Sequence, residues 1–222
     1  MKKKLMAIIL SVVLLLTLYP FQAMASQDIG ANERFVKAID ELYEGNTELK
    51  VYNSSGVEIT ADFKLAHSTS YQSGDYATIE AAFINSSLAM RRLTYNNNTR
   101  SETHTVTQYV LIYPRSTTNL NVGTLLEFDL QASYTLNSSN RIISATNPYI
   151  SRWYTNYVAM DYDSWTTRNI SASRNINSSG TSVTFNYSAE VVGYASVTVG
   201  DSLPVFIDHV FPINETFSVN VN

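Results

Sequence analysis

The sequence predicts a mainly β protein: a single antiparallel β-sandwich with Greek-key-like connections and one short amphipathic helix near its N-terminus. Three observations support this fold class. Apolar and polar residues alternate along most of the chain after residue 46, which is the period of a half-buried strand. Asn, Ser and Gly interrupt the alternation at short intervals, as turn-forming residues do. The chain of 222 residues has no cysteine, so it must fold by burying apolar side chains without disulfides.

The alternating segments are short and number roughly nine to eleven, which is typical of a sandwich or a barrel. The segment 104–112 ends in a continuous apolar run, so we expect burial on both of its faces. Asn53-Ser-Ser-Gly56 is expected to form a hairpin turn. One domain is preferred, and two small β domains divided near residue 120 are the alternative. The expected strands are 49–51, 57–63, 77–83, 104–112, 126–136, 141–144, 170–176, 183–192, 195–199, 205–210 and 216–221.

One helix is expected at 32–43, ahead of the β segments. Phe35, Ile39 and Leu42 recur at helical spacing and form an apolar stripe. Asn32 is a favourable N-cap, and Gly45 stands where such a helix would end. Because a helix this short is marginal by itself, we expect it to dock on one face or open end of the β domain. A helix that binds a partner is the alternative.

Residues 1–25 have the features of a secretory signal peptide. Three lysines follow Met1, residues 5–18 are almost continuously apolar, and Ala23-Met24-Ala25 has the small-x-small pattern of a cleavage site. The apolar run is shorter than the about 20 residues that span a bilayer. We therefore expect cleavage after Ala25 and a secreted product without a transmembrane span. The expected parts of the chain are the signal peptide at 1–25, an N-terminal helical part at 26–45 and the β-sandwich at 46–222.

Charge and cysteine content limit the classes of function. Removal of the signal peptide deletes three lysines and leaves 12 basic against 19 acidic residues. An acidic chain of this kind does not have the basic surface that nucleic acid requires. The absence of cysteine excludes a lipoprotein anchor and, together with the lysine-rich start of the signal peptide, favours a Gram-positive bacterium as the source.

Sequence motifs for catalysis do not occur. The chain has no Gly-x-Ser-x-Gly or Ser-x-x-Lys pattern, no glycine-rich phosphate loop, and three histidines that stand far apart. Asp161-Tyr162-Asp163 brings two carboxylates together, a spacing compatible with glycoside hydrolysis or with Ca²⁺, but the continuation of a calcium loop is missing. We expect no catalytic residue, cofactor or metal site. A carboxylate-based hydrolase using Asp161, Asp163, Glu190 and Asp208 is kept as a third hypothesis.

Aromatic residues concentrate at 149–165. The segment holds both tryptophans of the chain and four tyrosines, interleaved with Arg, Asn and Asp. Flat rings beside hydrogen-bonding groups are typical of surfaces that bind sugars or proteins, whereas the same rings can fill the space between two sheets. Both interpretations stay open at this point. The candidate binding residues are Tyr149, Arg152, Trp153, Tyr154, Asn156, Tyr157, Asp161, Tyr162, Asp163 and Trp165.

The sequence therefore favours an exported, non-enzymatic β-sandwich that binds a cell-envelope or extracellular partner, either a polysaccharide or a protein. A subunit that assembles through exposed strand edges is a variant of this hypothesis. A membrane-active, pore-forming β protein is the alternative, because residues 181–199 alternate as an amphipathic hairpin does.

Overall fold

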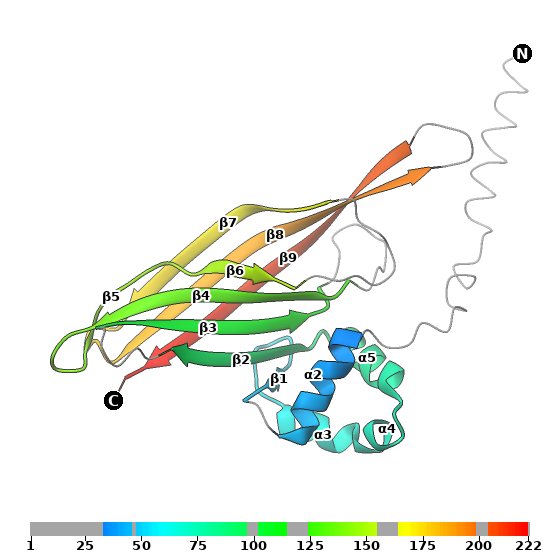
Figure 1. The fold of residues 1–222 in the computed structure, drawn as a ribbon, viewed down its shortest axis with the longest axis horizontal. Coiled ribbons are helices and arrows are strands. Elements are labelled where there is room, and N and C mark those ends of the chain that lie inside the picture. The colour runs from blue at the N-terminus through cyan, green and yellow to red at the C-terminus, as the bar shows by residue number, and fades with distance from the viewer. Residues whose placement is uncertain are drawn as a thin grey trace, which may run out of the picture. The chain divides into compact units, whose positions relative to one another are not determined.

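A computed structural model of the chain describes residues 33–45, 48–96, 102–114, 124–154, 164–198 and 204–221. These residues form nine strands in two antiparallel sheets and four helices in the N-terminal half (Figure 1). The prediction of a mainly antiparallel β fold with a helix near the N-terminus is confirmed. Among the described residues, no helix is both long and apolar enough to cross a bilayer.

The larger sheet, sheet A, has the strand order β1-β2-β3-β4-β5, and β6 pairs with β4 on the same side as β5. The smaller one, sheet B, has the order β7-β8-β9. Apart from β6, which returns to pair with β4, neighbouring strands of the described part of the chain are consecutive in the sequence. The strands are β1 (Lys50–Tyr52), β2 (Ala89–Asn96), β3 (Thr103–Ile112), β4 (Leu126–Leu136), β5 (Ile142–Ala145), β6 (Tyr149–Trp153), β7 (Ser164–Ile176), β8 (Ser182–Thr198) and β9 (Pro204–Asn220).

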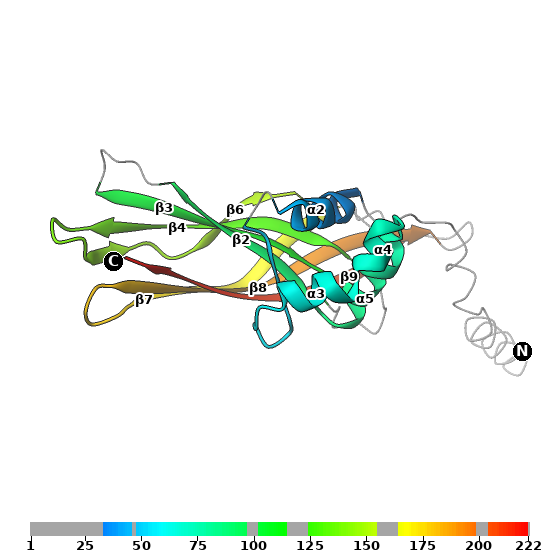
Figure 2. The ribbon, with the colours of Figure 1, turned by 90° about the horizontal axis from the view of Figure 1, so that it is seen from below.

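The sandwich core lies between the two sheets, which Figure 2 shows edge-on. Residues of every strand except β1 enter this core, because side chains of a strand point to opposite faces in turn. Phe128 and Leu130 of β4 pack there with Phe185 of β8 and Phe211 of β9, all of them fully buried. The alternation that predicted these strands is thus the alternation between core and solvent.

A second core lies on the opposite face of sheet A, under the helices. Phe35 and Ile39 of α2 pack there with Met90 of β2 and Leu111 of β3. Val110, next to Leu111, faces sheet B, so β3 is buried on both faces as its apolar run predicted. The helix expected at 32–43 therefore docks on the β domain. The helices are α2 (Glu33–Glu44), α3 (Thr60–Ala66), α4 (Ser68–Gln72) and α5 (Tyr76–Asn85).

The structure corrects the expected strand at 77–83, which lies in α5. Ile79 and Phe83 are four residues apart and both fully buried, as residues on one face of a helix are. The Asp75 side chain caps the helix by accepting a hydrogen bond from the Thr78 amide at 3.1 Å. Alanines at 77, 81 and 82 add helix propensity. The alternation of Ala, Ile, Ala and Phe fits both periods, and packing on sheet A selects the helix.

The expected hairpin at 49–63 is formed in part. Its turn is present, because the Gly56 amide donates to the Asn53 carbonyl at 2.9 Å. The second arm is reduced to an isolated bridge between Tyr52 and Glu58. From Thr60 onward the chain turns into α3, whose Phe63 enters the helix-side core. The strand expected at 57–63 is therefore wrong beyond its first residues.

The two edges of sheet B differ in regularity. The pairing of β7 with β8 shifts register between Arg168 and Ser171, and Asn169 there has a φ of 52°. This is the geometry of a β-bulge. The pairing of β8 with β9 has no register shift from Ser182–Asn220 to Thr198–Pro204. One outer edge of sheet B is therefore interrupted and the other is continuous.

Residues 1–32 lie outside the described residues. The signal peptide, its cleavage after Ala25 and the division of the chain at residue 45 stay predictions.

We expect Ile39→Ala in α2 to lower the free energy of unfolding by about 2–5 kcal/mol, because it opens a cavity between the helix and sheet A. Lys37→Ala, at an exposed position of the same helix, is the control and should change it by about 0.5 kcal/mol or less. Urea unfolding followed by circular dichroism measures both. Equal, small effects would show that α2 does not stabilise the domain.

Candidate functional site

The predicted aromatic segment is described only as far as residue 154. Tyr149, Arg152 and Trp153 lie on β6, and Tyr154 follows this strand. The backbone of Trp165 belongs to β7, but its side chain is outside the described set. Five further candidates, Asn156, Tyr157, Asp161, Tyr162 and Asp163, also lie outside the described residues.

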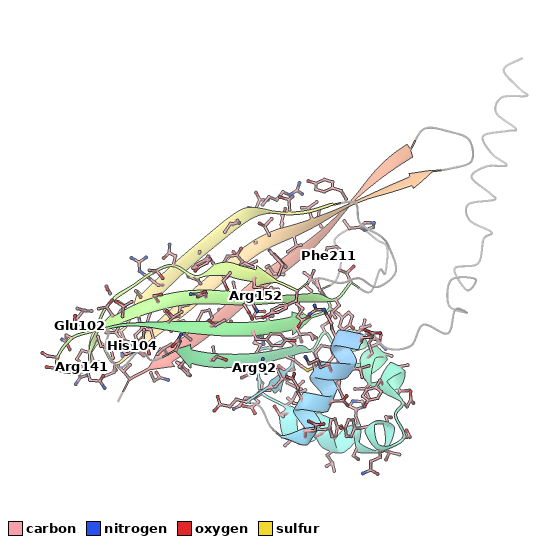
Figure 3. The ribbon with its side chains drawn as sticks, viewed as in Figure 1. Arg92, Glu102, His104, Arg141, Arg152 and Phe211 are labelled. Carbon is pink, nitrogen blue, oxygen red and sulfur yellow. The ribbon has the colours of Figure 1, made fainter. Side chains whose placement is uncertain are left out.

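Arg152 and Tyr154 join a network on the helix-side face of sheet A (Figure 3 labels Arg152). The Tyr154 hydroxyl donates to Asp129 Oδ2 at 2.7 Å and accepts from Arg152 Nη1 at 3.2 Å. The guanidinium groups of Arg34 and Arg152 lie 5.6 and 5.4 Å from the Tyr154 ring centroid. Burial is the main cause that raises the pKa of Tyr154. The network holds this tyrosine through contacts within the protein.

Glu127 connects the same network to α2. Its carboxylate accepts from Arg34 Nη1 at 2.7 Å and from the Tyr109 hydroxyl at 3.0 Å. Nearby, Arg92 pairs with Glu41 of α2 at 3.2 Å. A cavity of about 230 Å³ lies among these side chains. Because the charges and rings already contact one another, the network fastens α2 to sheet A.

Trp153 and Tyr149 lie in different environments. The Trp153 ring is 5.3 Å from that of Phe128, at the margin of the sandwich core, and 37% of the residue is exposed. Tyr149 is 51% exposed. The described part of the segment thus contributes to the core margin, to the network and to the surface, and the binding role of the whole segment stays a prediction.

A larger cavity lies along the edge of the sandwich formed by β1, β2 and β9. It has a volume of about 860 Å³. We call it the seam groove. It is lined by Lys50 and Tyr52 of β1, the turn 53–56, Arg91 to Leu93 and Tyr95 of β2, Gln108 of β3, and residues 212–218 of β9.

The seam groove exists because sheet A is wider than sheet B on this side. An ion pair between Arg91 and Glu215 joins β2 to β9. On the other side the Ile142 amide of β5 donates to the Gly180 carbonyl, in the turn between β7 and β8, at 2.7 Å. The strands of sheet B therefore face the part of sheet A between β5 and β2. Strand β1 of sheet A lies beyond β9, the outer strand of sheet B on this side, and has no described strand opposite it. Since Val51 points into the helix-side core, its neighbours on β1 point toward the unfilled place beside β9.

Arg91 and Glu215 form a bidentate ion pair at the inner wall of the seam groove. Arg91 Nε and Nη2 donate to the two carboxylate oxygens of Glu215 at 2.7 and 3.0 Å. The side chains are 19% and 2% exposed. Burial raises the pKa of the Glu215 carboxyl above its ordinary value, although the Arg91 charge and hydrogen bonds act in the opposite direction. The Arg91 guanidinium also lies 5.1 Å from the Tyr52 ring centroid, which joins β1 to the pair.

The edge of β9 presents backbone hydrogen-bonding groups to the seam groove. Pro212 pairs with Glu190 and has no amide hydrogen, so this pair is a non-hydrogen-bonded one. The Val221 amide donates to the carbonyl of Thr181, the residue before β8, at 2.9 Å. Odd-numbered residues of this segment therefore face β8. Because the register is continuous, the backbone groups of the even-numbered residues point away from β8. These are Asn214, Thr216 and Ser218.

The edge of β2 presents groups of the same kind. Ile59 donates to the Val51 carbonyl, and Val51 donates to Thr60 Oγ1, so the backbone groups of Val51 point away from β2. The pairs Lys50–Arg91 and Tyr52–Ala89, on either side of Val51–Met90, are then the hydrogen-bonded ones. The backbone amides and carbonyls of the odd-numbered residues of β2 therefore point away from β3, toward the outer edge. Beyond the end of β1, Leu93 and Tyr95 continue this edge. Deeper in the groove, Gln108 is 2% exposed, and its Oε1 has no hydrogen-bond partner among the described residues.

Comparison with known proteins adds no relative: no protein-family model, no curated protein and no solved structure matches the chain. Within the described ranges, no three His, Asp or Glu side chains come together as a metal site requires. The seam groove is thus defined by its geometry alone. Sequence reasoning missed it, although a proline inside the regular alternation of 205–221 is a signal of an edge strand.

Glu215→Ala should lower the free energy of unfolding by about 3 kcal/mol or more, because it leaves the charge of Arg91 unpaired at a mostly buried position. The matched control is Glu58→Ala, which removes the exposed ion pair with Lys50 and should cost less than about 1 kcal/mol. Guanidinium unfolding at neutral pH measures the difference. Similar losses in the two variants would contradict a buried role for the Arg91–Glu215 pair.

The raised pKa of Glu215 predicts a pH dependence of stability. The folded protein holds the proton of the Glu215 carboxyl more tightly than the unfolded chain does. The stabilisation that this proton gives is therefore largest below the ordinary pKa of 4.5 and is lost as the pH rises through the raised pKa. The stability of the wild type relative to Glu215→Gln should therefore fall as pH increases from 4.5 toward neutrality. Urea midpoints measured across this range give the slope. A difference that rises with pH would show that Arg91 dominates over burial.

Proposed function

We propose that the protein is an exported, non-enzymatic binding module that holds an extended segment of a cell-envelope or extracellular partner, a polysaccharide or a protein, in the seam groove. The observation that carries the proposal is the unfilled place in sheet B beneath β1, with a volume of about 860 Å³. This volume is within the range of about 300–1,000 Å³ that ligand sites occupy. The part of β9 along the groove, residues 212–218, spans about 20 Å, which suits an extended partner.

The lining of the groove supports binding. Tyr52 and Tyr95 supply aromatic rings, and the turn after β1 supplies the amide and hydroxyl groups of Asn53, Ser54 and Ser55. Rings next to hydrogen-bonding groups make favourable contacts with sugars and with polypeptides. These are the same residue types that made the segment 149–165 a candidate binding surface, but here they line a concavity.

The pairing of the charged groups supports a non-enzymatic role. Lys50 pairs with Glu58 at 2.9 Å, and Arg91 pairs with Glu215. General acid–base catalysis needs a titratable group placed to exchange a proton with a substrate. In the seam groove the Arg91–Glu215 pair instead joins the walls formed by β2 and β9.

Secretion is proposed from the features of residues 1–25, and a Gram-positive source from those features together with the absence of cysteine. The pore-forming alternative receives less support. Val183, Phe185 and Tyr187 are buried in the sandwich core, so core packing accounts for the alternation of their segment.

The double variant Tyr52→Ala/Tyr95→Ala should weaken partner binding at least about tenfold, because loss of aromatic anchors at a binding site costs about 1–2 kcal/mol or more. Tyr149→Ala removes an exposed ring of the same type from β6, outside the groove, and is the matched control. Retention is measured on isolated cell wall, on immobilised polysaccharides and on culture proteins.

Retention of the wild type and of Tyr149→Ala, with loss in the double variant, would support the seam groove as the site. Loss in Tyr149→Ala alone would move the site to the surface around β6. Failure of the wild type to bind any of the three materials would overturn the proposed function.

A further inference from the structure

We infer that the partner is a polypeptide, which adds a strand to the β9 edge of sheet B beneath β1. This inference rests on the proposed function and names the class of its partner. An extended peptide can pair with an exposed sheet edge through its main chain, and side-chain pockets then select among sequences. The seam groove has such an edge as one of its walls.

The first argument is the repeat of backbone groups along β9. Asn214, Thr216 and Ser218 present amides and carbonyls outward, and Pro212 adds a carbonyl. Side chains of alternate residues recur about every 6.8 Å in an antiparallel strand, and so do the outward backbone groups. A guest strand has the same repeat and can pair at each position. A polysaccharide has no regular series of amides and carbonyls to match it.

The second argument is the cover that sheet A provides. A strand added to β9 would lie beneath β1, so that Tyr52 would contact its inward side chains as Arg91 of β2 contacts Glu215 of β9. The guest would thus be buried on one face like the strands of sheet B. An edge strand without such cover offers only its backbone.

The third argument is the contrast with the other edge of sheet B. On β7 the bulge between Arg168 and Ser171 interrupts the edge, and charged side chains stand on either side of it at Arg168 and Arg174. Bulges and charges are devices by which natural sheets prevent strand addition. β9 has a continuous register, and no charged residue other than the inward Glu215 occurs between Pro212 and Asn220.

The groove also indicates the chemistry of the guest. About five residues are needed to pair from Asn214 to Ser218. The guest needs no acidic inward side chains, because Lys50 and Arg91 on the wall are already paired with Glu58 and Glu215. A hydroxyl or amide among its inward side chains could satisfy the buried amide of Gln108. We therefore expect a guest segment with hydroxyl groups and without acidic side chains, and β-branched residues such as Thr and Val favour the extended conformation that it must adopt.

The probe is a synthetic peptide that meets this description, acetyl-Lys-Thr-Val-Thr-Val-Thr-Val-Thr-Lys-amide. We expect saturable binding to the wild-type protein, measured by calorimetry. N-methylation of one alternate set of its amides should weaken binding at least about tenfold, and methylation of the other set should have little effect, because only one set faces β9. Absence of binding by the unmodified peptide, or equal effects of the two methylated forms, would overturn the inference.

The protein variants are Thr216→Pro and Thr216→Ala. Both remove the side-chain hydrogen bond to Asn186, but only the proline removes the outward amide. Pro212 shows that β9 accepts proline at a position of the same orientation. We expect Thr216→Pro to weaken peptide binding at least about tenfold relative to Thr216→Ala, with similar circular dichroism spectra.

The two proposals fail in different ways. If Tyr52→Ala/Tyr95→Ala loses the natural partner while Thr216→Pro and Thr216→Ala bind it equally, the seam groove is the site but strand addition is wrong. If none of these variants affects binding, both proposals are wrong.

Discussion

Burial of sheet A on both faces is the constraint on which the rest of the structure depends. Val110 and Leu111 are adjacent on β3, yet one packs against sheet B and the other against the helices. A sheet that is apolar on both faces cannot leave either to water, so the helices between Glu33 and Asn85 are required as much as sheet B is. This also fixes the place of β1. Its Val51 belongs to the helix-side core, which holds the strand in position without support from sheet B.

The parts of the fold that follow a single period could be predicted from the sequence. The long alternations of β4 and β8 and the stripe Phe35, Ile39 and Leu42 identify two strands and a helix, since each pattern fits one period only. The alternation at 77–83 fits both periods, because Ile79 and Phe83 share a face in either structure. Contact with sheet A decides the outcome there, and this contact joins residues that are distant in the sequence.

The candidate site could be predicted less well, because it depends on how two sheets are aligned. Composition identified the aromatic residues at 149–154, but local sequence does not show that Tyr154 would meet Arg34 from a helix more than a hundred residues earlier. The seam groove results from a difference in width between sheets A and B. No single segment encodes this difference. The buried pair of Arg91 and Glu215, from strands far apart in the chain, joins β2 to β9, the outer strand of sheet B.

The unequal edges of sheet B have a consequence for stoichiometry. Under the proposed mode of binding, a strand would add at β9 only, because the bulge at Asn169 interrupts the other edge. The guest would fill the place beneath β1, and the interrupted β7 edge would accept no second guest. If the guest binds as proposed, the unequal edges of sheet B favour complexes of one guest per chain.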